Sequence, residues 1–154
     1  MRNRQDVTGV AYKYLEDVSI ADVAFEATGK TLDGMFESAG LAVTNVMVKN
    51  LRSVKPGIRK TIKLENKDVE KLLFNFLQEF VFWKDKDLLL FSKVCVKIKE
   101  PKKPGQPYSM VATLSGDKID AKKHDMLVDV KAVTWHLFKV EKTKDWKCHV
   151  VLDI

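Results

Sequence analysis

Residues 127–154, LVDVKAVTWHLFKVEKTKDWKCHVVLDI, decide the fold of this chain. Two runs that alternate between apolar and polar residues flank a polar linker, EKTKD at 141–145, which is the pattern of an antiparallel hairpin. Even-numbered positions are mostly apolar in both runs. The two apolar sets therefore share one face only if even residues pair with even residues. A five-residue loop that sets Val140 opposite Trp146 meets this condition.

The same register gathers charged residues at one end of the hairpin. It places Asp153 opposite Val133 and diagonal to Lys131, and Asp129 lies on the same face. The α-carboxylate of Ile154 falls close by. This end of the hairpin is therefore the best candidate for a functional site, although the solvated face of any half-buried sheet carries charges of this kind.

Composition describes an ordinary globular chain. Its 154 residues are 45% hydrophobic and 31% charged, which suits one domain with a real core. The net charge of +6 comes mainly from scattered lysines. Such a charge suits an acidic or nucleic-acid partner, or simply a lysine-rich soluble surface.

The cysteines and the apolar runs predict where the protein resides. Cys95 and Cys148 lie in expected strands and lack metal-like spacing, so we expect reduced, partly buried cysteines and no zinc site. No apolar run reaches membrane length, and residues 1–10 have no signal-peptide core. The sequence thus predicts a soluble cytoplasmic protein that does not enter a membrane.

Two helices are expected among the strands. Thr31 can cap a helix that runs to about residue 49, and Asp68 can cap a second helix from Val69 to about Lys84. The first contains two glycines, which are unfavourable in a helix and indicate close packing against it. Further strands are expected at 12–28 (with a bend or bulge near 17–20), 58–64, 88–99 and 108–114.

The order of these elements predicts the fold class. Residues 1–10 are polar and form a flexible N-terminal arm, which leaves residues 11–154 as a single domain. Strands, separated helices and a final meander are typical of an α+β fold rather than a doubly wound parallel sheet. We expect a mixed or antiparallel sheet of six or seven strands packed against two helices.

No motif for a self-sufficient enzyme is present. The sequence lacks a phosphate loop, a dinucleotide fingerprint and a nucleophile elbow, and its histidines are scattered. Three acids remain as candidates: Asp22, Asp129 and Asp153. Oxygen ligands alone suit hard cations such as Ca²⁺ or Mg²⁺. If the strand of Asp22 lies beside the hairpin, the three carboxylates converge and Lys131 limits their repulsion.

Several segments, taken in order, resemble the archease family. The resemblance covers nearly the whole chain from Tyr12, and its most specific parts are KAVT at 131–134 and the Asp-Ile end. It implies an archease-like domain. The matching segments are YKYLE at 12–16 before ADV at 21–23, GKTL at 29–32 before MFE at 35–37, DVEKLLFNFL at 68–77, DVKAVTWH at 129–136 and LDI at 152–154.

The resemblance implies an accessory protein rather than an enzyme. Archeases assist the RNA-splicing ligase that joins tRNA exon halves: they promote its guanylylation, restore its turnover and can broaden the nucleotide that it accepts. The expected partner is thus RNA-splicing ligase, with tRNA engaged indirectly through it. The family's metal-site acids fall on Asp22 and Asp153 with Ile154 nearby, and its other functional acid and lysine fall on Asp129 and Lys131. The implied cofactor is a divalent metal, Ca²⁺ with Mg²⁺ or Mn²⁺ as alternatives.

One motif departs from the family pattern. The family usually has Asp-His-Thr-Ala-Asp where this chain has DVSIAD at 17–22, so the histidine is absent and one residue is inserted. Two other functions stay open. A general chaperone, or a modulator of an RNA-modification enzyme, would use the basic surface and the aromatic residues of the second helix. A metal-dependent hydrolase would need a nucleophile or general base beside the acids, and none is present in the sequence there.

Overall fold

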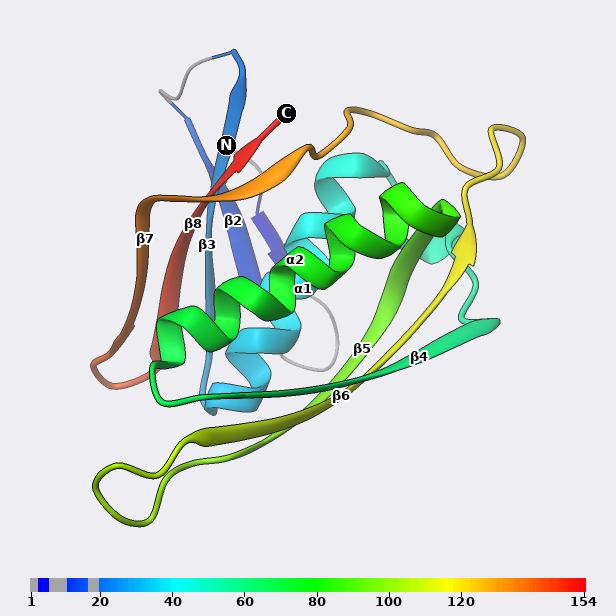
Figure 1. The fold of residues 1–154 in the computed structure, drawn as a ribbon. Coiled ribbons are helices and arrows are strands. Elements are labelled where there is room, and N and C mark those ends of the chain that lie inside the picture. The colour runs from blue at the N-terminus through cyan, green and yellow to red at the C-terminus, as the bar shows by residue number, and fades with distance from the viewer. Residues whose placement is uncertain (1–2, 6–10, 17–19) are drawn as a thin grey trace.

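The structure is a computed structural model that describes residues 3–5, 11–16 and 20–154. These residues form two antiparallel sheets with two α-helices between them (Figure 1). One sheet has the strand order β1-β2-β3-β8-β7, and the other has the order β4-β6-β5. The strands are β1 (Asn3–Gln5), β2 (Ala11–Leu15), β3 (Asp22–Gly29), β4 (Ile58–Asn66), β5 (Leu89–Lys99), β6 (Tyr108–Lys118), β7 (Ala132–Lys142) and β8 (Trp146–Asp153).

The predicted α+β class, the antiparallel strands and the two packed helices are confirmed, and the strands divide between two sheets. The expected segment 12–28 consists of two strands, β2 and β3, that pair with each other. Of the predicted N-terminal arm, residues 3–5 form β1 beside β2, and residues 1–2 and 6–10 lie outside the described residues. The expected bend near 17–20 lies mostly outside them as well.

Both helices begin at their predicted caps. The Thr31 side chain accepts a hydrogen bond from the Gly34 N–H at 3.0 Å and starts α1 (Leu32–Met47). Asp68 accepts from the Glu70 N–H at 2.8 Å and starts α2 (Val69–Asp87), which continues one turn beyond its predicted end. A short 3₁₀ helix, η1 (Leu51–Ser53), follows α1. Neither helix combines the length and hydropathy needed to cross a bilayer, as far as the described residues go.

Phenylalanine side chains join the layers into one core. Phe36 of α1 contacts Phe76 of α2 with ring centroids 5.6 Å apart. Phe80 continues the chain of rings, at 5.3 Å from Phe76 and 5.7 Å from Phe91 of β5. A Cβ atom placed on Gly40 would lie 2.5 Å from the Phe80 ring. The close packing expected at the glycines of α1 is thus confirmed at Gly40, where the helices cross.

The helices also protect the edges of the two sheets. An edge strand presents unpaired N–H groups that invite another chain to pair with it. Side chains of α1 accept such groups from β5, and side chains of α2 accept them from β7. The pairs are Val96 N–H to Glu37 (2.9 Å), Ile98 N–H to Asp33 (3.1 Å), Val133 N–H to Gln78 (3.2 Å) and Val140 N–H to Glu70 (2.8 Å).

The C-terminal hairpin has a shorter turn than the alternation predicts. Lys142 pairs with Trp146 and Val140 pairs with Cys148, so the predicted pairing of Val140 with Trp146 is wrong. Even residues still pair with even residues near the turn, as expected. The tighter turn adds ladder pairs to the hairpin and places the Lys142 ammonium 5.4 Å from the centre of the Trp146 ring.

A bulge changes the register in the middle of the hairpin. The pairing jumps between Thr134 and Lys139, and Leu137 adopts a positive φ of 54° within the jump. Beyond the bulge Asp153 lies opposite Ala132, and the predicted pairing of Asp153 with Val133 is wrong. Because the jump inserts three extra residues on β7, an odd number, it exchanges the faces of the strand. Val133 therefore points into the core, where it is buried.

Candidate functional site

The start of β3 and the end of β8 bring two predicted site residues together. Asp22 and Asp153 are direct partners in the antiparallel register, although they stand at opposite ends of the chain. Directly opposed residues share a face of the sheet, with Cβ atoms about 4.5–5.5 Å apart. The Ile154 N–H donates to the Ala21 carbonyl oxygen at 2.9 Å. Ile154 is thereby held at the same end of the sheet as the two aspartates.

Asp129 and Lys131, the other two predicted residues, precede β7 instead of lying in it. The Lys131 N–H donates to the Asp153 carbonyl oxygen at 2.8 Å, and the Lys131 side chain is exposed. Asp129 turns to α2, where its carboxylate lies 2.6 Å from the Lys84 ammonium. The predicted single strand face carrying Asp129, Lys131 and Asp153 is therefore wrong, because the bulge moves Ala132 onto the Asp153 face.

Lys84 is a neighbour of the site that sequence reasoning missed. Its side chain is only 6% exposed, and its ammonium donates to the carboxylates of Asp129 and Asp85 and to the Val130 carbonyl oxygen at 2.8 Å. Burial lowers the pKa of Lys84, but hydrogen bonds and charges from Asp129 and Asp85 outweigh it and raise the pKa above its ordinary value. The ammonium thus stays charged and anchors the segment before β7 to α2.

The sequence contains a signal for Lys84. It follows Phe76 and Phe80 at intervals of four, so it occupies a position on the apolar stripe of α2. A lysine on such a stripe needs carboxylate partners to be buried. Asp85 lies on α2 itself, and Asp129 lies on the segment before β7, which in Figure 1 runs over α2 toward the C terminus at the end of β8.

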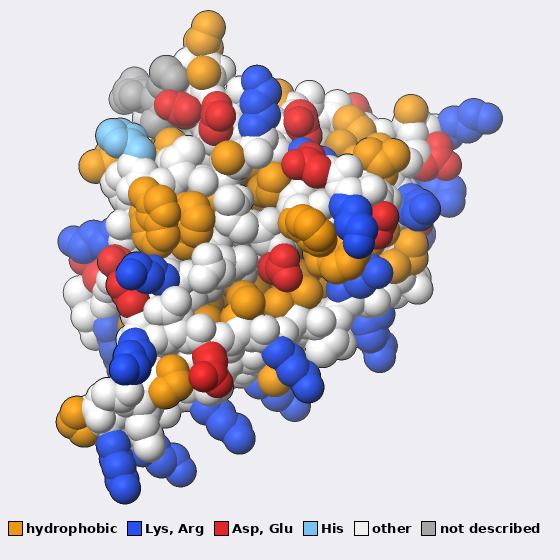
Figure 2. Space-filling model, viewed as in Figure 1, with side chains coloured by type: hydrophobic (Ala, Val, Ile, Leu, Met, Phe, Trp, Pro, Cys, Tyr) orange, Lys and Arg blue, Asp and Glu red, His pale blue; other side chains and the backbone are white. Residues whose placement is uncertain are grey.

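The arrangement at the end of β3 and β8 suits a hard divalent cation in its donor chemistry. Asp22 and Asp153 supply two carboxylates on one face, and Ile154 lies at the same end. Figure 2 shows acidic side chains gathered at this end of the molecule. In the described ranges, no three His, Cys, Asp or Glu side chains cluster as a metal site. Residues 17–19, where the chain departs from the archease pattern, lie outside these ranges.

The two cysteines take different positions, and both are free thiols. Cys148 of β8 is buried next to Ala27 of β3, and burial raises the pKa of its thiol to about 12. It therefore stays protonated and serves packing. Cys95 is exposed on β5, so the prediction that it is partly buried is wrong. Its odd-numbered position alternates with the inward-facing Val94 and Val96, which turns it to solvent.

Known proteins match this fold over most of its length. A sequence model of the Archease protein family (MTH1598/TM1083) matches residues 12–154. The chain is 35% identical over 136 residues to the protein archease of Pyrococcus furiosus, covering 87% of this chain and 93% of that protein. It is also 35% identical over 147 residues to the protein archease of Methanosarcina acetivorans, covering 95% of this chain and 97% of that protein.

A solved structure matches in three dimensions as well. The solution structure of Methanobacterium thermoautotrophicum protein 1598 superimposes with a TM-score of 0.78 at 31% sequence identity. The match covers 93% of this chain and 98% of that chain, so it includes both sheets and both helices. The sequence matches and the fold agree, and the chain belongs to the archease family.

Proposed function

We propose that this protein is an accessory factor that activates the RNA-splicing ligase of tRNA maturation. It promotes guanylylation of the ligase and restores its turnover, and it can alter which nucleotide the ligase accepts. One observation carries the proposal: β3 and β8 set Asp22 opposite Asp153 and hold Ile154 beside them. Membership of the archease family supports the assignment.

The fold makes this acidic end a rigid platform. β8 is flanked by β3 and β7, so the backbone of Asp153 is held from both sides. The Lys131 N–H supplies one of these bonds, and Lys84 keeps Asp129 and the adjoining segment against α2. A platform of this kind can enter the cleft of a partner without first losing conformational entropy on ordering.

The side chains of the platform suit a partner site that handles metal ions and nucleotides. Asp22, Asp153 and the carboxylate of Ile154 would hold a divalent cation, Ca²⁺ by preference and Mg²⁺ or Mn²⁺ as alternatives. A bound cation supplies positive charge that neutralises the acids and attracts phosphate oxygens. The exposed ammonium of Lys131 can contact a phosphate directly, and Asp129 offers a carboxylate to the ligase. In this proposal the ligase performs the chemistry, and the tRNA is engaged through the ligase.

The proposal is tested by the rate of ligase guanylylation. The cognate ligase is mixed with GTP and Mn²⁺, with and without this protein, and the covalent guanylate is followed over time. We expect the wild type to accelerate the reaction and Asp153→Asn to lose at least about tenfold of that acceleration, since outer-shell partners of a metal site alone change its activity this much. Asp145→Asn, an exposed acid at the other end of β8, is the matched control. Equal acceleration by Asp153→Asn, or none by the wild type, would overturn the proposal.

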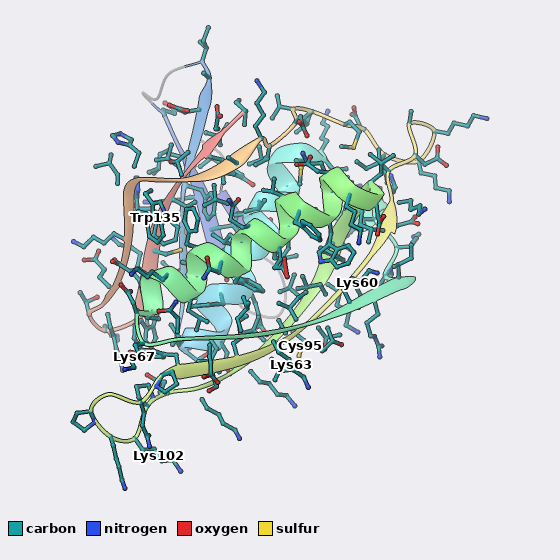
Figure 3. The ribbon with its side chains drawn as sticks, in the orientation of Figure 1. Lys60, Lys63, Lys67, Cys95, Lys102 and Trp135 are labelled. Carbon is teal, nitrogen blue, oxygen red and sulfur yellow. The ribbon has the colours of Figure 1, made fainter. Side chains whose placement is uncertain are left out.

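A second candidate function, a general chaperone or a modulator of an RNA-modification enzyme, is favoured by an exposed aromatic group. Trp135 is 51% exposed and stacks on Phe74 of α2 with ring centroids 4.0 Å apart (Figure 3). Leu137, in the bulge, is 65% exposed. If this group binds client proteins, Trp135→Ser will reduce suppression of client aggregation and Asp153→Asn will not. The free thiols of Cys95 and Cys148 support a cytoplasmic setting for either function.

A further inference from the structure

The solvent faces of the two sheets differ in charge: one carries paired positive and negative side chains, and the other carries mostly cations. On the five-stranded sheet, lysines of neighbouring strands are neutralised by two glutamates. Glu26 of β3 pairs with lysines of the strands on both sides, and Glu141 of β7 pairs with Lys147 of β8 and with Lys139 of its own strand, so positive and negative side chains alternate across this face. The pairs are Lys13–Glu26 (3.8 Å), Lys147–Glu26 (3.9 Å), Lys147–Glu141 (3.6 Å) and Lys139–Glu141 (3.2 Å).

The solvent face of the three-stranded sheet is cationic. Its register sets two basic rows across the central strand: Lys63, Val111 and Lys97 form one row, and Arg59, Ser115 and Lys93 form the other. A third row joins Glu65 and Lys99 through Ser109. These three rows therefore hold five cations, Arg59, Lys63, Lys93, Lys97 and Lys99, and one carboxylate, Glu65.

These five cations are not neutralised within the described part of the chain. None of the ion pairs found there includes any of them. Two strand spacings separate the columns on β4 and β5 by about 9.5 Å. This distance is close to the Debye length of about 8–10 Å at ordinary salt, so salt only partly screens the repulsion between the two columns of lysine and arginine side chains. A polyanion that lies between the columns would relieve this repulsion.

A cavity lies at the end of the sheet where three of these lysines stand. Its volume is about 580 Å³, and its lining comes from all three strands: Lys63, Leu64 and Glu65 of β4, Lys97, Ile98 and Lys99 of β5, and Ser109, Met110 and Val111 of β6. Lys63 and Cys95 lie on the side of the sheet that faces away from the helices (Figure 3). Figure 2 shows a row of basic side chains projecting from the same edge of the molecule, away from the end with the C terminus.

We propose that this cationic face, made of Arg59, Lys63, Lys93, Lys97 and Lys99, binds the phosphate backbone of RNA. The face carries no aromatic side chain, so it lacks the stacking platform by which sheets read unpaired bases. Its contacts are therefore independent of base sequence. This direct RNA contact goes beyond ligase activation, and only the choice of RNA among phosphate polymers rests on the proposed function.

The face is tested by fluorescence anisotropy with a labelled oligouridylate and the isolated protein. The variant Lys63→Gln with Lys97→Gln removes the central row, and Lys122→Gln with Lys123→Gln removes the same charge from an exposed turn after β6. We expect the first variant to bind about tenfold more weakly and the control to bind within about twofold of the wild type. Because each phosphate contact contributes about 0.7 to the salt dependence of single-strand binding, the slope of log K against log salt should fall by about 1.4 in the first variant only.

Several results would overturn this inference. They are the absence of saturable binding by the wild type at low salt, equal weakening in both variants, and tighter binding of DNA or polyglutamate of matched length. A thermal unfolding curve for each variant shows whether the protein remains folded. No ligase is present in this assay, so its result is independent of whether the protein activates guanylylation.

Discussion

Burying a lysine ammonium costs its hydration free energy, and the side chain stabilises the fold only if its hydrogen bonds and ion pairs offset that cost. Lys84 gains two carboxylates and a carbonyl oxygen. The Asp129 carboxylate remains 63% exposed, so it stays hydrated when the lysine is removed. The Val130 carbonyl is buried and has no such alternative. The main effect of Lys84 is thus to satisfy this carbonyl and to hold the segment that leads to β7.

Replacing Lys84 with methionine keeps the length of the side chain and removes the donor. We expect a loss of about 2 kcal/mol, the cost of leaving a buried acceptor unsatisfied. This corresponds to a fall of roughly 4–8 °C in the unfolding midpoint. Calorimetry of Lys84→Met against Lys71→Met, an exposed lysine of the same helix, measures it. An equal midpoint for the two variants would show that the buried ammonium contributes nothing.

The pH dependence of this difference follows from the raised pKa of Lys84. A group whose pKa is higher in the folded state stabilises the fold fully below its unfolded pKa, here 10.5, and loses that effect as the pH rises through the folded value. The gap between wild type and Lys84→Met should therefore stay constant from about pH 6 to 9. It should narrow only above pH 10.5.

A further prediction about single residues concerns the affinity of the acidic end for a divalent cation. We expect Ca²⁺ titration by calorimetry to show one site, weakened at least about tenfold in Asp22→Asn and in Asp153→Asn. A Gly-Ser extension after Ile154 moves the α-carboxylate away and should weaken binding similarly without lowering the unfolding midpoint. The same extension at the N terminus is the control. Unchanged affinity in the C-terminal extension would exclude the terminal carboxylate as a ligand.

Among the elements, the C-terminal hairpin shows how far alternation predicts structure. The two strands, their antiparallel pairing and the even-with-even rule near the turn follow from residues such as Val140 and Cys148. The bulge does not, because the bulged residues 135–138 include three apolar side chains that suit either face. The stacking of Trp135 on Phe74 accompanies the bulge. Phe74 belongs to a helix that is far from Trp135 in the sequence, so the local residue pattern does not predict this contact.

The helix side chains that accept N–H groups of the edge strands give a second prediction about the elements of the fold. Glu37 accepts from the Val96 N–H at 2.9 Å, and a hydrogen bond to a carboxylate is worth about 1.5–3 kcal/mol. In Glu37→Ala we expect the Val96 amide to exchange its hydrogen at least about tenfold faster, while amides of the central strand β6 stay protected. Glu65→Ala, an acid on the outer face of the same sheet, is the control. Unchanged protection of Val96 would show that the helix does not cap this edge.

For the whole molecule, the sequence predicts the parts better than their arrangement. Thr31 and Asp68 mark the helices because a cap is a local device. The division of the strands into two sheets depends on which strands meet around α1 and α2, and no local pattern encodes this choice. The same holds for the candidate site. The family resemblance indicated Asp22 and Asp153, whose pairing the structure shows. The ion pair of Asp129 with Lys84 could not be predicted, because it depends on how α2 packs.

The two ends of the molecule have distinct expected tasks. We propose that the acidic end at β3 and β8 binds the ligase and that the cationic face of β4, β6 and β5 binds RNA; the two lie on opposite sides of the helical layer (Figure 1). Residues that act as one site produce strongly non-additive losses when they are mutated together. Asp22 and Asp153 should therefore behave as a unit toward the ligase.

The most direct test is a double-mutant cycle on the rate of ligase guanylylation, with wild type, Asp22→Asn, Asp153→Asn and the double variant. We predict that each single variant loses most of the acceleration given by the wild type and that the double variant loses no more than the worse single one. Additive losses, or a single variant that accelerates guanylylation as well as the wild type does, would contradict a shared site at the paired ends of β3 and β8.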